Sequence, residues 1–144
     1  MEEILALDML TLRAHTLAAG QVFDEVSHRA ALKRVLPKSK LVKVFRKERL
    51  AGYVYLWPKG DGLWFVGGFA VHPGFRFGNV LRALLRAVEG LVISENIREL
   101  QSHVYKTNAR SLALHRRLGY EVVDENEKGY AFSLKLAGEI SAGF

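Results

Sequence analysis

The sequence GGFAVHPGFRFGNVLRALL, which runs from Gly67 to Leu85, is the stretch from which the rest of the chain can be interpreted. It begins as an apolar strand, breaks at residues 72–74, and passes through a basic, glycine-containing turn into an amphipathic helix. Such a turn directs several backbone N–H groups and the positive end of a helix dipole toward one point, which suits a phosphate or pyrophosphate group. Many strand–turn–helix junctions contain glycine and bind nothing, so the junction alone leaves both interpretations open.

The composition indicates a single globular domain. The chain has 144 residues, of which 49% are hydrophobic and 25% are charged, and this length is sufficient for a hydrophobic core. No apolar run approaches the roughly 20 residues that span a bilayer, and the N-terminus MEEILALD is acidic where a signal peptide is basic. We therefore expect no membrane association and a cytoplasmic location.

The sequence offers few metal ligands. The absence of cysteine excludes disulfides, thiolate nucleophiles and zinc–thiolate sites. His15 and His28 have no partner at metal-ligand spacing, so we expect no metal and interpret both histidines as structural or surface residues.

The positive charge is concentrated in one segment. The net charge is +6, and between Lys33 and Arg49 eight residues are basic and Glu48 is the only acid. This balance favours an anionic partner such as nucleic acid, a membrane surface or a polyphosphate-bearing cofactor, although a solvated basic face with no ligand would look the same. Aromatic residues do not alternate with the basic ones as in a platform for single strands, so nucleic acid is not excluded but has no support in the sequence.

The spacing of apolar residues predicts an α+β domain with helices first and strands after Pro37. Asn108 is a favourable N-cap for a late short helix, and Gly119 closes it where a positive φ is tolerated. The glycine pair Gly67–Gly68 indicates a bulge or a close approach by another group. Helices are expected at Glu3–Ala19, Phe23–Leu36, Val80–Leu91 and from Asn108, and strands at Leu41–Phe45, Leu50–Trp57, Leu63–Val71, Glu99–Tyr105, Tyr120–Val123 and Tyr130–Leu136.

Two stretches together resemble the GNAT superfamily of N-acetyltransferases. The first, Ala70–Pro73 followed by Phe75-Arg76 and a helix, is similar to the family's pyrophosphate-binding motif: arginine or glutamine, two residues, glycine, one residue, then glycine or alanine. The second, Val104 followed by NARSLALHRRLGY at 108–120, is similar to the family's strand, asparagine, short helix and closing glycine-aromatic pair. Arg76 takes the first motif position, whereas Asn79 and Leu81 stand where glycine and glycine or alanine are expected.

The resemblance implies one GNAT-like domain: a mixed, mostly antiparallel central sheet flanked by helices, with a cofactor cleft between two splayed strands. Residues 1–36 would form the helical acceptor side, and residues 41–136 the sheet and the cofactor-binding core. It implies acetyl-CoA as the acetyl donor and a primary amine, in a small molecule or a peptide, as the acceptor. The residues implied for acetyl-CoA binding are Phe69, Ala70, Val71, Arg76, Phe77, Gly78, Asn79, Val80, Leu81, Asn108 and Ser111.

His115 is the candidate catalytic residue. At 100° per residue it shares a helix face with Asn108 and Ser111, and the resemblance places it where the family often has a tyrosine that protonates the leaving thiolate. Histidine can also do this because its pKa lies near neutrality, and Tyr105 is the second candidate.

A general base is not identified. The strand Leu63–Val71 contains no acid, and His72, His103, Tyr105 and Glu125 remain alternatives. A different function also stays open, namely a degenerate member of the fold that has weak or no catalysis and holds an anionic partner on its basic face.

Overall fold

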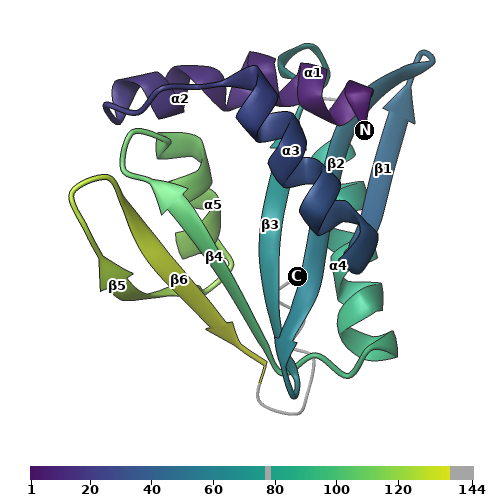
Figure 1. Cartoon of the computed structure of the whole chain (residues 1–144). Coiled ribbons are helices and arrows are strands. Elements are labelled where there is room, and N and C mark those ends of the chain that lie inside the picture. Colours follow the sequence, from purple (N-terminus) through teal and green to yellow (C-terminus); the bar gives the residue numbers. More distant parts are fainter. Residues whose placement is uncertain (77–78, 137–144) are drawn as a thin grey trace.

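The structure is a computed structural model that describes residues 1–76 and 79–136. In this part of the chain six strands form one sheet with the order β1-β2-β3-β4-β6-β5 (Figure 1). Neighbouring strands are antiparallel except β3 and β4, which are parallel. The predicted α+β fold with a mixed, mostly antiparallel sheet is therefore confirmed. The strands are β1 Lys40–Arg46, β2 Arg49–Gly60, β3 Leu63–Val71, β4 Glu99–Tyr105, β5 Glu121–Glu125 and β6 Gly129–Lys135.

The strands differ from the prediction mainly at the turns. β3 and β4 begin and end at the predicted residues. Residues 58–60 follow the predicted strand Leu50–Trp57 and extend β2, because Pro58 and Gly60 pair with the first two residues of β3. The hairpin between β1 and β2 turns at Lys47 and Glu48, which both have positive φ and lie between the predicted strands.

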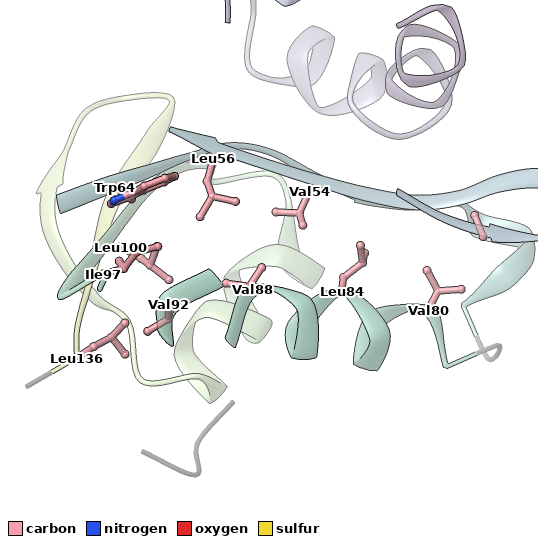
Figure 2. Close-up of a cluster of buried hydrophobic side chains, with 11 residues drawn as sticks. Val54, Leu56, Trp64, Val80, Leu84, Val88, Val92, Ile97, Leu100 and Leu136 are labelled. Atoms are coloured by element: carbon pink, nitrogen blue, oxygen red, sulfur yellow. The ribbon is translucent and has the colours of Figure 1, made fainter. Parts of the chain in front are cut away.

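Helices cover both faces of the sheet. In Figures 1 and 2, α4 and α5 lie on one face, and the N-terminal helices lie on the other. Asp24 caps α3, since its carboxylate accepts from the Val26 N–H at 3.0 Å. The helices are α1 Glu2–Thr11, α2 Arg13–Ala18, α3 Glu25–Val35, α4 Val80–Ser94 and α5 Ala109–Arg117, with short 3₁₀ turns η1 Leu36–Lys38 and η2 Pro73–Phe75.

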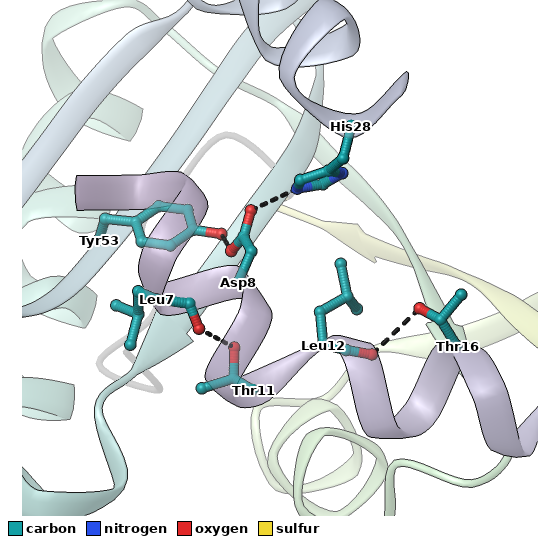
Figure 3. A network of polar contacts seen from close by, with 7 residues as sticks. All are labelled: Leu7, Asp8, Thr11, Leu12, Thr16, His28 and Tyr53. Atoms are coloured by element: carbon teal, nitrogen blue, oxygen red, sulfur yellow. Dashed lines mark hydrogen bonds and ion pairs between the residues drawn. The ribbon is translucent and has the colours of Figure 1, made fainter. Parts of the chain in front are cut away.

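The prediction of one continuous helix over Glu3–Ala19 is wrong. The segment forms α1 and α2, which are separated at Leu12. The Thr11 hydroxyl donates to the Leu7 carbonyl and the Thr16 hydroxyl to the Leu12 carbonyl, both at 3.0 Å (Figure 3). Threonine hydroxyls that bond to the carbonyl four residues earlier tend to bend helices. The apolar spacing continues across the break, which explains why periodicity alone did not reveal it.

The main core lies between the sheet and α4 (Figure 2). Val80, Leu84 and Val88 of the predicted apolar stripe are buried, and Leu81 is half-buried. Full burial of such a side chain contributes about 1.5–3 kcal/mol to folding, so this face anchors α4. The buried members are Ala51, Val54, Leu56, Trp64, Val80, Leu84, Val88, Val92, Ile97, Leu100 and Leu136.

A second cluster joins the N-terminal helices to the opposite face of the sheet. It combines leucines and an isoleucine of α1 and α3 with aromatic residues of β2. Among the described residues, no helix is both long and apolar enough to cross a membrane. The buried members of this cluster are Ile4, Leu5, Leu7, Leu32, Leu50, Tyr53, Tyr55 and Ala70.

Candidate active site

The parallel strands β3 and β4 pair only at their beginnings. The pairing covers Leu63–Phe65 and Glu99–Gln101, and beyond these residues the two strands diverge (Figure 1). The edge of β3 from residue 66 to residue 71 therefore has no pairing with β4. The two strands therefore splay, as the resemblance to the GNAT superfamily implies, and β3 borders the opening. Phe69, Ala70 and Val71 lie along its unpaired edge, which can offer N–H and C=O groups to an extended ligand.

A β-bulge shapes β3 beside this opening. The register between β2 and β3 shifts there, and Gly67 has no partner on β2. A Cβ atom at Gly67 would collide with the Trp57 ring, and one at Gly68 with the Tyr55 ring. Both predicted roles of the glycine pair, a bulge and a close approach, are confirmed, and the approaching groups are aromatic rings of β2.

His72 holds the turn after β3. Its backbone N–H donates to the Ala51 carbonyl at 2.7 Å, and its Nδ1 accepts from the Gly74 N–H at 2.9 Å. The Phe75 N–H donates to the His72 carbonyl at 2.9 Å. The imidazole thus uses Nδ1 to shape the junction. Arg76 follows as an exposed residue, while the predicted ligands Phe77 and Gly78 lie outside the described residues.

The first amides of α4 have no acceptor among the described residues. Asn79, which stands in place of the expected glycine, has φ 58° and ψ 17°, so it adopts the left-handed conformation that asparagine tolerates. The first intrahelical bond runs from the Ala83 N–H to the Asn79 carbonyl at 3.0 Å. The N–H groups of Val80, Leu81 and Arg82 therefore have no acceptor within the helix. This geometry suits an anionic group.

Asn108 and Gly119 limit α5 as predicted. The Asn108 side chain accepts from the Ser111 N–H at 3.2 Å, and Gly119 has φ 92°. Because its side-chain oxygen caps the helix, Asn108 orients the first turn of α5 next to the end of β4.

His115 lies between α5 and the sheet with both ring nitrogens in hydrogen-bond contact. Nδ1 is 2.7 Å from the Ser111 carbonyl oxygen, and Nε2 is 2.7 Å from the Ser102 hydroxyl. A carbonyl only accepts, so Nδ1 donates, and in the neutral ring Nε2 accepts from Ser102. The rings of Tyr120 and Phe132 lie 4.6 and 4.8 Å away. Burial lowers the pKa of His115 below its usual 6.5, and the bond to the Ser111 carbonyl opposes this shift.

The other candidates for proton transfer, His103, Tyr105 and Glu125, line one pocket that His115 does not line. The Tyr105 hydroxyl donates to Gln21 Oε1 at 3.0 Å. His103 is exposed, and its ring meets Phe65 edge-on at 5.0 Å. Glu125 pairs with Lys106 at 2.6 Å. The structure does not bring these groups together with His115 into one constellation.

Sequence reasoning missed a buried polar cluster on the opposite face of the sheet. Asp8 of α1 contacts Tyr53 of β2 and His28 of α3 (Figure 3). The available signal was the position of Asp8 four residues after Ile4, within the buried stripe of α1, because a carboxylate at a core position needs polar partners. Which partners it meets depends on tertiary contacts far apart in the sequence.

Comparisons with known proteins agree with this geometry. The model of the acetyltransferase (GNAT) family matches residues 9–120, so the chain belongs to the GNAT acetyltransferase family. No curated protein matches the sequence.

Solved structures share the fold at low sequence identity. A GNAT-family acetyltransferase from Staphylococcus aureus Mu50 has a TM-score of 0.76 and 11% identity, with 94% of this chain and 92% of that chain covered. The PaiA N-acetyltransferase from Thermoplasma acidophilum, in complex with coenzyme A, has a TM-score of 0.71 and 12% identity over 93% and 91%. A GNAT-family acetyltransferase from Elizabethkingia anophelis with acetyl-CoA bound has a TM-score of 0.64 and 15% identity over 74% and 82%.

Proposed function

We propose that this protein transfers the acetyl group of acetyl-CoA to a primary amine. The observation that carries the proposal is the juxtaposition of two sets of backbone groups that have no partner among residues 1–76 and 79–136. One is the edge of β3 that faces the opening, and the other is the first turn of α4. The former suits an extended pantetheine arm and the latter suits a pyrophosphate. Family membership favours this use of the site.

Each predicted cofactor residue has a specific place in this arrangement. Phe69–Val71 would pair with the pantetheine arm through their backbone. Arg76 and the first amides of α4 would hold the pyrophosphate, with the left-handed Asn79 supplying the turn that glycine would otherwise supply. Asn108 and Ser111 stay predictions as cofactor ligands. The Asn108 side chain caps α5 through the Ser111 N–H, and Ser111 also contacts His115.

The reaction needs little covalent help from the protein. When bound, acetyl-CoA supplies the activated thioester. The chain's own contribution would be to position the amine against the carbonyl carbon and to polarise the carbonyl oxygen with a backbone N–H near Val71. Positioning and oriented dipoles of this kind supply most of the rate in many acyl transfers.

His115 and Tyr105 stay predictions as donors of a proton to the leaving thiolate. For His115 the geometry imposes a condition. Nδ1 already donates to a carbonyl, so the ring can pass a proton through Nε2 toward Ser102 only when both nitrogens are protonated. Ser102 is the first residue of β4 beyond the segment paired with β3, which places this contact near the point where the strands part.

Cofactor affinity tests the proposal directly. Calorimetric titration of the wild-type protein with acetyl-CoA should show binding that weakens with salt, because screening reduces contacts between cations and phosphates. Arg76→Ala should lose about 1.5–3 kcal/mol of binding free energy, as expected for a hydrogen bond to a charged group. Arg13→Ala is the matched control, since Arg13 is an equally exposed arginine on α2.

The outcomes separate the two functions. Binding by the wild type and by Arg13→Ala, together with weak binding by Arg76→Ala, supports the cofactor site. Equal affinity in all three proteins would place the pyrophosphate elsewhere. A wild-type protein that binds polyanions but not acetyl-CoA would instead be the degenerate binding module.

A further inference from the structure

The buried carboxylate of Asp8 receives two hydrogen bonds. Its side chain is 3% exposed. The Tyr53 hydroxyl donates to Oδ1, and His28 Nε2 lies 2.6 Å from Oδ2 (Figure 3). Burial, and then the charge of Asp8, raise the pKa of Tyr53 well above 10.0, so its hydroxyl keeps its proton and remains a donor. The site therefore fits a carboxylate with one donor on each oxygen.

The contact with Asp8 decides which nitrogen of His28 is protonated. A carboxylate only accepts, so Nε2 carries the proton, and Nδ1 of the neutral ring holds a lone pair. Nδ1 has no hydrogen-bond partner among the described residues. It is also not one of the buried polar atoms that lack a partner, so it is accessible to solvent. The side chain of His28 is 21% exposed. One nitrogen is thus anchored, and the other is available to a molecule outside the fold.

The N-terminal region contacts strands on both sides of the opening between β3 and β4. Asp8 reaches Tyr53, which lies opposite Ala70 of β3 in the sheet. On the other side, Gln21 accepts from the Tyr105 hydroxyl at the end of β4. The segment between α2 and α3 therefore bridges toward β4, while α1 rests on β2 and β3. His28 is the fourth residue of α3, which follows this bridge, and its ring lies 5.2 Å from the Phe23 ring.

We propose that His28, oriented by Asp8, is the base that deprotonates the acceptor amine. This assignment rests on the proposed function, since a base is needed only if an ammonium group is the incoming form of the acceptor. His28 Nδ1 takes one proton from the ammonium group and later releases it to solvent. The freed lone pair attacks the acetyl carbon, so the C–N bond forms and the C–S bond breaks. The thiolate leaves with the electron pair of the C–S bond. The nitrogen then loses its second proton, which balances the proton that the thiolate takes up to become a thiol.

His72 and His115 are less suited to this step. His72 uses Nδ1 in the turn after β3, and both nitrogens of His115 have partners. β3 itself contains no acid. A protonated His28 would also face the Asp8 carboxylate, and a charge-assisted hydrogen bond would then stabilise the imidazolium.

The sharpest variant is His28→Gln. Its side-chain amide retains an N–H donor for Asp8 but has no nitrogen that can take up a proton. Transfer to an alkylamine, which arrives as an ammonium ion, should fall by about 10²–10⁴-fold in kcat/KM. Transfer to a weakly basic acceptor, such as an aromatic amine or hydroxylamine, should fall far less, because that acceptor arrives neutral. Asp8→Asn is the companion variant and should lower the same alkylamine reaction.

The two acceptors distinguish catalysis from structure. A structural role predicts equal losses with both amines, or no loss at all, and either result overturns the base assignment. A wild-type protein that binds acetyl-CoA and acetylates amines while His28→Gln remains fully active refutes the base alone. A wild-type protein that acetylates no amine in a panel of polyamines, aminoglycosides, amino acids and peptides refutes the proposed function, and the base with it.

A measurement without any acceptor provides an independent test. Nitrogen-15 NMR of the His28 ring in the wild-type protein should report a proton on Nε2 and a lone pair on Nδ1 in the neutral form. The opposite tautomer would overturn the proposal, because the accessible nitrogen could not then accept a proton.

Discussion

The two faces of the sheet are held by different kinds of contact. On the α4 side, Leu84 and Val88 close against Val54 and Leu56 in an apolar layer (Figure 2). On the side of the N-terminal helices, aliphatic contacts surround a buried carboxylate that joins α1, α3 and β2 (Figure 3). The first face gains stability from close packing. On the second face, the carboxylate of Asp8 is buried, and its hydrogen bonds offset the free-energy cost of that burial.

The histidines show the same difference. His115, on the α4–α5 side, has partners for both nitrogens and lies against the rings of Tyr120 and Phe132. His28, on the opposite side, has one anchored nitrogen and one nitrogen without a partner among the described residues. Hydrogen bonding at both nitrogens fixes a ring in place, whereas bonding at one nitrogen orients the ring and leaves the other for chemistry. The contrast supports the proposed role of His28 as the base and shows that the His115 ring is held at both nitrogens.

The largest effect on stability is expected from Leu84→Ala. Leu84 is 0% exposed in the apolar layer, and truncation of such a leucine costs about 2–5 kcal/mol. Ile93→Ala is the matched control, because Ile93 lies on the same helix and is 63% exposed; it should change stability by about 0.5 kcal/mol or less. Urea denaturation with unchanged m-values measures both. Similar losses in the two variants would show that the α4 face is not the main source of stability.

His115→Phe should have a smaller effect on stability. Phe preserves the aromatic packing but leaves the buried Ser102 hydroxyl without its partner, at a cost of about 1–3 kcal/mol. Ser102→Ala added to this variant should recover part of the loss, because both polar partners are then absent. Greater loss in the double variant would contradict the hydrogen-bond explanation.

The same variant tests His115 as an acid. If it protonates the leaving thiolate, turnover by the folded variant should fall about 10²–10⁴-fold with cofactor affinity nearly unchanged. Near-normal turnover would leave His115 a packing role and make Tyr105 the next candidate.

Local sequence signals predicted the structural features that depend mainly on residues adjacent in the chain. The glycine pair at 67–68, the Asn108 cap and the positive φ of Gly119 each follow from the conformational demands of one short segment. The break at Leu12 was missed because two threonine hydroxyls compete with the helix while the apolar spacing continues.

The chemistry that was missed depends on distant residues. Asp8, His28 and Tyr53 meet only after α1, α3 and β2 have packed, and no local pattern joins residues so far apart. The same applies to Ser102 and His115, which lie on a strand and a helix separated by a turn. The helix-face geometry predicted that His115 would share a face with Ser111, and their contact confirms it. It did not reveal that the ring would lie against β6, because the partner of a helix face is decided by the sheet.

The smallest expected effect is a change in how stability depends on pH. Burial lowers the pKa of His115 below 6.5 in the folded protein, so the unfolded chain takes up the proton first as the pH falls. The sign follows: stability from the neutral ring is fully present above 6.5 and is lost as the pH falls toward the folded pKa. Urea midpoints of the wild type and His115→Phe, measured from about pH 7.5 to about pH 5.5, should therefore converge toward the acid end. The other titrating groups are common to both proteins and cancel in the difference. A constant difference between the two urea midpoints across this range would show that His115 has the same pKa in the folded and unfolded states. That result would contradict the burial of the His115 ring as the cause of its lowered pKa.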